Sequence, residues 1–156
     1  MSKASKYIDD YRKMERDDFA YFFVENTRWG DLDAIGHINN VLYARYYESA
    51  RTSYFGDLLD IKFVSKTPIS LILADMKIAY LQQLHHPASM QIGARVSRIG
   101  GSSMQFDAAV FVEGNDHAIS TSRASLVWFD YSQNQSVKIP QDVREKISEF
   151  EKIVPA

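Results

Sequence analysis

The chain has 156 residues and a net charge of −2, with 46% hydrophobic and 24% charged residues, which is the composition of one globular domain. This near-neutral balance argues against nucleic acid as the main partner. The absence of cysteine excludes disulfides, a thiol nucleophile and thiolate metal sites, and it fits a cytoplasmic location. Residues 1–17 are charged and predict a short helix or a frayed arm rather than a signal peptide. Without a run of about 18 apolar residues, we expect no membrane span.

The first half of the chain predicts a strand, a loop and a long helix. Residues 19–27 are rich in aromatic and β-branched side chains, which is typical of a strand. Residues 28–36 contain two glycines and two aspartates and predict a loop. From residue 41 to residue 58, apolar and aromatic positions recur at the spacing of one helix face, so a helix of about five turns is expected. Asn39 or Asn40 is the predicted N-cap.

Beyond this helix the apolar residues alternate with polar ones, which indicates strands. The alternation covers residues 72–80, 90–96, 104–112 and 119–131. Gly100-Gly101 and Gly114-Asn115-Asp116 are typical of tight hairpin turns, and a short helix is expected over residues 142–152. We therefore predict one α+β domain over residues 1–156. Its antiparallel sheet, with the last four strands in hairpin succession, wraps around the long helix, because that helix must bury its apolar face.

A distinctive motif joins the predicted loop to the helix. Residues 31–40 follow the pattern Asp-x-Asp-x-x-Gly-His-x-Asn-Asn, and aromatic residues and Glu-x-Ala-Arg come after it. The segment 28–51 resembles the signature of the 4-hydroxybenzoyl-CoA thioesterase-like hotdog proteins, and also the matching segment of plant acyl-ACP thioesterases. The resemblance extends over about residues 19–140. It implies the hotdog fold, dimers that join two sheets, often tetramers, and hydrolysis of acyl-CoA or acyl-ACP without a metal or other cofactor.

The second aspartate of the motif, Asp33, matches the family's catalytic carboxylate. It can act as a general base for water or as a nucleophile that forms an anhydride. Asp31 is interpreted as a structural acid of the turn. His37 matches the histidine of the plant motif, but Ile35 stands where the plant pattern has asparagine. Two interpretations of His37 stay open: it orients the substrate carbonyl, or it only holds the loop.

Other site residues are predicted along the helix. Backbone N–H groups at the positive end of the helix dipole suit an oxyanion, and these are at Asn40, Val41 and Leu42. An acyl pocket at a dimer interface, or alternatively only the core, would use the tyrosine stripe Tyr43, Tyr46 and Tyr47. Glu48 is a candidate second carboxylate, although a helical salt bridge with Arg45 or Arg51 is the favoured interpretation.

The resemblance also implies that Arg98, Ser102 and Ser103 contact CoA. The alternative, that they are ordinary charged and polar side chains on the strand surface, explains each of them at least as well. His85, His86 and His117 lie at predicted turns without paired acids, so no metal site is expected. Two alternative functions remain. The same groove could bind an acyl thioester without cutting it, or His37 and Glu48 could serve a hotdog hydratase or dehydratase.

Overall fold

The computed structural model describes residues 7–156, so part of the predicted arm at residues 1–17 lies outside the described residues. The strands are β1 (Tyr21–Asn26), β2 (Ile69–Tyr80), β3 (Ser89–Ile99), β4 (Ser103–Val112), β5 (Asn115–Asp130) and β6 (Gln135–Ser136). The α-helices are α1 (Leu42–Leu59) and α2 (Gln141–Phe150), and short 3-10 turns lie at Tyr11–Lys13, Arg16–Asp18 and Trp29–Asp31. The predicted elements are present with their ends shifted by a few residues, and β6 was not predicted.

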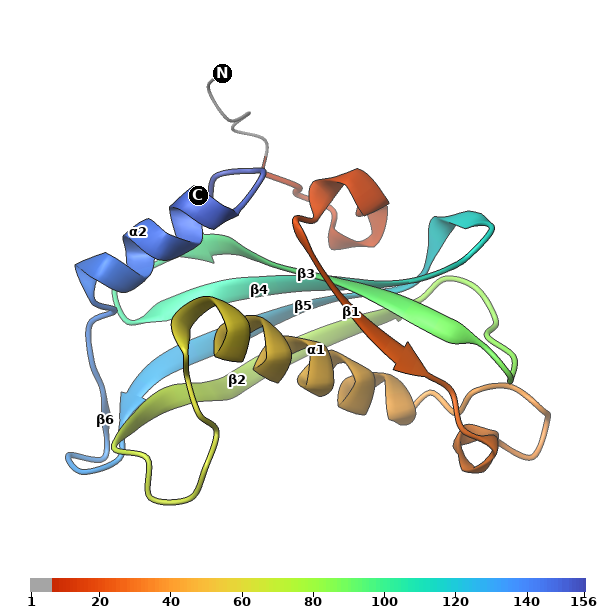
Figure 1. Cartoon of the computed structure of the whole chain (residues 1–156), viewed down its shortest axis with the longest axis horizontal. Coiled ribbons are helices and arrows are strands. Elements are labelled where there is room, and N and C mark those ends of the chain that lie inside the picture. The colour runs from red at the N-terminus through yellow and green to blue at the C-terminus, as the bar shows by residue number, and fades with distance from the viewer. Residues whose placement is uncertain (1–6) are drawn as a thin grey trace.

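The strands form one antiparallel sheet in the order β1-β3-β4-β5-β2, with the short β6 beside β5 (Figure 1). The predicted hairpin succession is confirmed for β3, β4 and β5. It is wrong for β2, which pairs with β5 while β3 pairs with β1. The connection 81–88 carries the chain from one side of the sheet to the other. Alternation shows which residues share a strand face but not which strand lies next to it.

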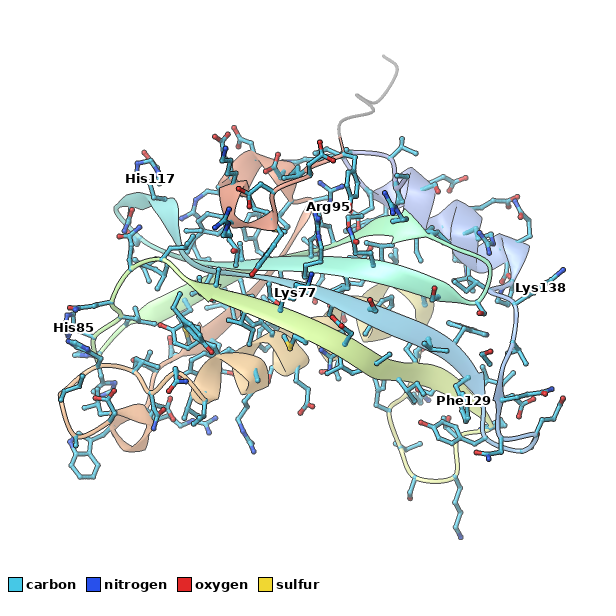
Figure 2. The ribbon with its side chains drawn as sticks, turned by 180° about the vertical axis from the view of Figure 1, so that it is seen from behind. Lys77, His85, Arg95, His117, Phe129 and Lys138 are labelled. Carbon is cyan, nitrogen blue, oxygen red and sulfur yellow. The ribbon has the colours of Figure 1, made fainter. Side chains whose placement is uncertain are left out.

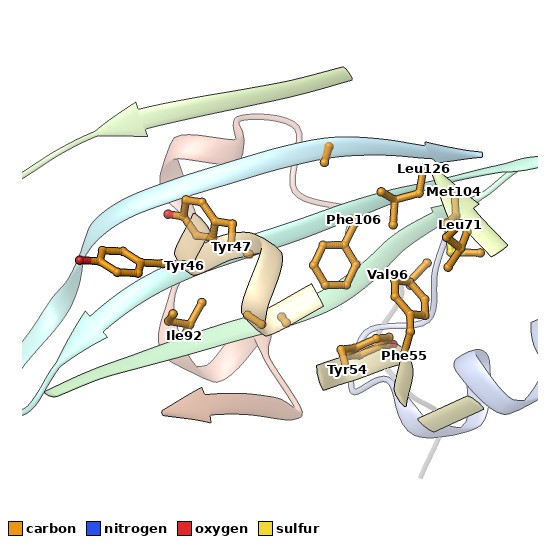
Figure 3. Close-up of a cluster of buried hydrophobic side chains, with 14 of the residues drawn as sticks. Tyr46, Tyr47, Tyr54, Phe55, Leu71, Ile92, Val96, Met104, Phe106 and Leu126 are labelled. Carbon is orange, nitrogen blue, oxygen red and sulfur yellow. The ribbon is translucent and has the colours of Figure 1, made fainter. Parts of the chain in front are cut away.

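Helix α1 lies along the concave face of the curled sheet (Figure 1), which confirms the predicted wrapping. Its buried side chains are Tyr43, Tyr46, Tyr47, Ala50, Tyr54 and Phe55. Figure 3 shows Phe106 of β4 beside the last two of these, with ring centroids 5.4 Å from Tyr54 and 5.5 Å from Phe55. Packing of such large rings supplies much of the apolar burial that holds the helix on the sheet.

The two edges of the sheet differ in whether their backbone groups are paired. The part of β3 that extends past β1 is covered by the C-terminal segment. The Val96 N–H donates to Glu151 Oε1 (2.9 Å), and Ile99 and Ser97 exchange backbone hydrogen bonds with Ala156 (3.0 Å each). On the other side, β2 is the last strand, and no described residue pairs with its outer edge. A long free edge of this kind is a ready template for pairing with another strand.

The convex face of the sheet is covered in part by the N-terminal arm. Ile8, Tyr11 and Met14 pack on a second apolar cluster that includes Phe19 and Phe111. None of the described helices is long and apolar enough to cross a membrane.

Candidate active site

The loop before α1 is folded tightly around the carboxylate of Asp33. Its Oδ1 accepts hydrogen bonds from the backbone N–H groups of Ile35 (3.0 Å) and His37 (3.1 Å), and its own N–H donates to the His37 carbonyl (2.8 Å). The turn needs a positive φ of 83° at Gly36, a conformation that glycine adopts at low cost. Oδ2 takes part in neither of these loop hydrogen bonds.

Asp31 anchors this loop to the core. It is buried, and its Oδ2 accepts hydrogen bonds from the Tyr46 hydroxyl (2.7 Å) and the Arg28 N–H (3.0 Å). Its carbonyl accepts a further bond from the Asn39 N–H (2.8 Å). The two aspartates of the motif therefore differ in their contacts, since the Asp31 carboxylate is buried and binds Tyr46 of α1, whereas the partly exposed Asp33 carboxylate binds backbone N–H groups of its own loop.

A cavity of about 200 Å³ opens beside Asp33. Its other lining residues are His37, Ile38, Asn40, Tyr43, Tyr80, Gln82, Gln83 and Leu84. The Tyr80 hydroxyl donates to the Asn40 carbonyl (3.1 Å), and the Tyr80 ring meets Tyr43 edge-on at 5.3 Å. The His37 ring packs on His85, which is labelled at this end of the molecule in Figure 2, at 5.0 Å.

The structure thus places Asp33, His37, Asn40 and Tyr43 at one cavity. Tyr80 and the segment 82–84 join them, and the sequence interpretation did not select these as site residues. The available signal was weak: Tyr80 ends the alternating pattern of its strand. Only the return of β2 along β5 brings that end to the start of α1.

The start of α1 has fewer unpaired backbone N–H donors than the sequence predicted. The side-chain Oδ1 of Asn39 accepts the Val41 N–H (3.2 Å), and the Asn39 carbonyl accepts the Leu42 N–H (3.0 Å). Asn39 therefore closes the turn before the helix. The N-cap of α1 is Val41, which makes no side-chain capping hydrogen bond, so the predicted N-cap at Asn39 or Asn40 is wrong. Of the three predicted oxyanion donors, the N–H of Asn40 is the one without a hydrogen-bond acceptor among residues 7–156.

The three tyrosines of the predicted stripe have different surroundings. The Tyr47 hydroxyl donates to Ser120 Oγ (2.7 Å) and that of Tyr46 to Asp31, and both rings are buried. Burial raises the pKa of both hydroxyls, and for Tyr46 the adjacent Asp31 carboxylate raises it further. Only Tyr43 also lines the cavity beside Asp33.

Burial, together with the neighbouring Tyr80, raises the pKa of Tyr43 from 10.0 to about 12. The folded state therefore holds the neutral phenol more strongly than the unfolded chain does. Its contribution to stability is fully present below pH 10 and is lost as pH rises toward 12. We expect the free energy of unfolding, measured in urea between pH 8 and pH 12, to fall less steeply in Tyr43→Phe than in the wild type. An equally steep fall in both proteins would contradict the raised pKa of Tyr43.

The remaining predicted positions lie apart from Asp33. Glu48 is exposed, 3.9 Å from Arg51, and lines a separate cavity of about 110 Å³ together with Tyr46. Arg98, Ser102 and Ser103 lie at the far end of β3, whose start is next to the end of β1. A strand of 11 residues spans about 35 Å, so these residues are a strand length away from the site in the same chain.

The Arg98 guanidinium lies over the Tyr7 ring at 4.6 Å. Among residues 7–156, no group of three or more histidine, aspartate or glutamate side chains is arranged to hold a metal ion. Three of the predicted residues, Leu42, Tyr46 and Glu48, line the separate cavity of about 110 Å³, and Arg98, Ser102 and Ser103 line neither cavity.

An antiparallel sheet curled around one helix is the architecture of the hotdog-fold thioesterases. The chain belongs to the thioesterase-like superfamily, whose family model matches residues 27–147. The predicted fold class and family are thereby confirmed.

Individual relatives agree with this assignment. The chain is 25% identical over 121 residues to the acyl-acyl carrier protein thioesterase ATL3, chloroplastic, of Arabidopsis thaliana. The match covers 77% of this chain and 63% of that protein, so the chain spans less than two thirds of its length. The PA5185 protein of Pseudomonas aeruginosa superimposes with a TM-score of 0.80 and 27% identity, covering 88% of this chain and 95% of that one.

A thioesterase from Thermus thermophilus, solved with coenzyme A and Zn, is also similar in structure. It superimposes with a TM-score of 0.74 and 26% identity, and the match covers 86% of this chain and 97% of that one. Membership of this superfamily supports thioester hydrolysis as the general reaction.

Proposed function

We propose that the protein hydrolyses acyl-CoA or acyl-ACP thioesters to a free acid and a thiol, with Asp33 as the reacting carboxylate. One observation carries the proposal: the loop positions Asp33 through Oδ1, Oδ2 takes part in neither of these hydrogen bonds, and Asp33 lines a cavity at the start of α1. A carboxylate held in this way is preorganised to accept a proton or to attack a carbonyl.

In the proposed reaction, Asp33 takes a proton from a water molecule as the water oxygen bonds to the thioester carbon. The carbonyl oxygen becomes an oxyanion, and the N–H of Asn40 and the positive end of the α1 dipole stabilise it. When the tetrahedral intermediate collapses, the C–S bond breaks and the sulfur leaves as the thiol with the transferred proton. As an alternative, Asp33 attacks the carbon directly and forms an anhydride that water then hydrolyses.

His37 and Tyr80 are proposed to position the substrate rather than to transfer the proton. His37 is fixed to Asp33 through its backbone and presents its ring beside His85. Tyr80 holds the Asn40 carbonyl, which orients the peptide unit just before α1. The CoA bound to the Thermus thermophilus relative supports CoA as one carrier to test, and the name of the Arabidopsis relative supports acyl carrier protein.

A panel of acyl-CoA and acyl-ACP substrates of different chain lengths tests the function, with release of the free thiol as the readout. We expect turnover of at least one acyl class by the purified wild-type protein. Stabilisation by the ligand without turnover would instead indicate a non-catalytic binding module. Addition of water to an enoyl-CoA would indicate a hydratase.

We also propose that two copies pair through β2. This strand has 12 residues, and the exposed apolar side chains at or near its free edge are Ile69, Leu73, Tyr80 and Leu81. Pairing of the two edges about a twofold axis would satisfy the outward backbone groups and bury these side chains. A further association of dimers into tetramers stays a prediction.

Light scattering coupled to size exclusion tests the pairing. Leu73→Lys places two like charges near the proposed axis, and we expect it to raise the dimer Kd at least ~100-fold. The matched control is Val24→Lys on β1, because Val24 is also an exposed apolar residue of an outer strand. Dissociation by the control alone would point to β1 as the interface.

A cytoplasmic location is proposed from the cysteine-free composition, which suits a reducing compartment. The Arabidopsis relative is chloroplastic by name. Fractionation of cells that express the tagged protein distinguishes a cytoplasmic from an organellar location.

A further inference from the structure

Two histidine rings meet beside the Asp33 cavity. His37 belongs to the motif loop before α1, and His85 belongs to the connection 81–88 between β2 and β3. Their ring centroids are 5.0 Å apart and their planes are inclined by 77°. His37 is half-buried and His85 is exposed, so both rings are within reach of solvent. An edge-to-face contact of this kind is ordinary aromatic packing when considered alone.

The ring nitrogens of this pair are not used by the fold. Among residues 7–156, no hydrogen bond or ion pair involves the imidazole of His37 or of His85. The next residue in the chain is different, since Nδ1 of His86 is hydrogen-bonded to Thr27 Oγ1 (2.9 Å). A neutral imidazole binds a metal ion through one ring nitrogen. The pair therefore keeps two potential metal ligands that no structural contact requires.

The backbone holds the two histidines at a fixed spacing. The Ile38 N–H donates to the Leu84 carbonyl (2.8 Å), which joins the two residues that adjoin His37 and His85. The N–H of His37 also donates to Asp33 Oδ1 (3.1 Å), and its carbonyl accepts the Asp33 N–H (2.8 Å). The χ2 torsion of histidine is broad, so each ring can turn at small cost. The positions of the two rings are thus preorganised while their orientation stays adjustable.

The ring spacing and the local charge both suit one metal ion. With Zn–N bonds of about 2.1 Å and about 1.1 Å from each nitrogen to its ring centre, two imidazoles on a tetrahedral ion have centroids about 5.2 Å apart. The observed spacing is 5.0 Å. Asp33 lines the adjacent cavity together with His37, and no lysine or arginine lines it. A nearby carboxylate without a competing cation favours the binding of a positive ion.

We propose that His37 and His85 bind one divalent transition-metal ion, such as Zn²⁺, with water completing its coordination. No third histidine, aspartate or glutamate among residues 7–156 is arranged with them to hold a metal. Catalytic zinc sites have three protein ligands, so this site is expected to bind more weakly and reversibly. An ion held there lies beside Asp33 and blocks the approach of the substrate. The site is therefore inhibitory, and this second part rests on the proposed thioesterase function.

Calorimetric titration with ZnCl₂ at pH 7.5 tests the binding, with protein that carries no affinity tag. We expect one ion per chain in the wild type. His85→Asn should lower the affinity at least ~10-fold, since even an outer-shell partner of a metal contributes that much. The matched control is His117→Asn, because His117 is also exposed and Figure 2 shows it apart from His85. Equal affinity in the wild type and His85→Asn would overturn the proposal.

Diffraction at the zinc absorption edge locates the ion in crystals grown with ZnCl₂. We expect an anomalous peak bonded to one nitrogen of His37 and one nitrogen of His85, each at about 2.1 Å. A peak on His85 alone, or no peak at this pair, would refute the shared site.

Enzyme assays test the inhibitory part. At a Zn²⁺ concentration ten times the Kd, about nine-tenths of the sites are filled, so hydrolysis should slow about 10-fold and recover when EDTA is added. The readout is loss of thioester absorbance, because released thiols bind zinc. Each protein is compared with its own metal-free rate, and His85→Asn should need at least ~10-fold more zinc for the same inhibition. Zinc binding that leaves hydrolysis unchanged would overturn the inhibitory part. Zinc binding in a protein without turnover would instead refute the thioesterase function.

Discussion

Asp33→Asn is expected to lower kcat/KM for thioester hydrolysis at least ~100-fold, the scale of a lost general base, while the fold is preserved. Asparagine keeps an oxygen at Oδ1, so it can still accept the hydrogen bonds from Ile35 and His37. It loses the second carboxylate oxygen and the negative charge that the reaction requires. Thiol release gives kcat/KM, and thermal unfolding followed by circular dichroism reports whether the fold persists.

Asp31→Asn is the matched control, with the same chemical change two positions earlier. Asp31 accepts hydrogen bonds from the Tyr46 hydroxyl and the Arg28 N–H and does not line the cavity of Asp33. We expect this variant to lose about 1 kcal/mol of stability and to keep kcat/KM within a few-fold of the wild type. If Asp33→Asn kept full activity, or if Asp31→Asn alone abolished it, the assignment of roles within the motif would be wrong.

Asp107→Ala is expected to lower the free energy of unfolding by about 3–5 kcal/mol, because it removes one partner of a buried charge pair. Asp107 is fully buried and accepts two hydrogen bonds from Arg123, at 2.8 and 2.9 Å. In register it also lies opposite Arg95, which is 1% exposed and whose guanidinium has no hydrogen-bond acceptor among residues 7–156. Asp107 is thus the carboxylate between two arginines on the convex face, where Figure 2 labels Arg95 and Lys77.

Urea unfolding of the single and double variants measures how much the Asp107–Arg123 pair contributes to the free energy of unfolding, apart from the contacts around it. Asp107→Ala combined with Arg123→Met removes both charges, and we expect it to recover part of the stability lost in Asp107→Ala. The recovery should be incomplete, because Arg123 also donates to the carbonyl groups of Ile8 and Asp9 in the N-terminal arm. A loss below ~1 kcal/mol in Asp107→Ala would show that this pair contributes little.

Local patterns in the sequence predicted the elements well. The spacing of Tyr43, Tyr47 and Tyr54 on one helix face defines α1, and it depends only on contacts within a few residues. The glycine pair at residues 100–101 likewise predicted the β3–β4 hairpin. The position of β2 was not predictable in this way, because β2 and β3 both alternate regularly and nothing in either strand identifies its neighbour.

The candidate site was likewise predictable from the sequence only in part. The motif around Asp33 is contiguous in the chain, so local sequence was sufficient to define the carboxylate loop, its glycine turn and the helix start that follows. Tyr80 joins that loop only because β2 crosses to the far side of the sheet and runs back along β5.

The packing of the elements also sets which predicted residues stay apart. The side chains of Tyr46 and Tyr47 are bound to Asp31 and Ser120, whereas Arg98 lies a strand length from Asp33. Sequence spacing fixes contacts along one element, but contacts between elements depend on how the chain packs its apolar faces. For this protein, the contiguous motif defined the carboxylate proposed to react, and the packing of α1 and β2 defined the cavity it faces.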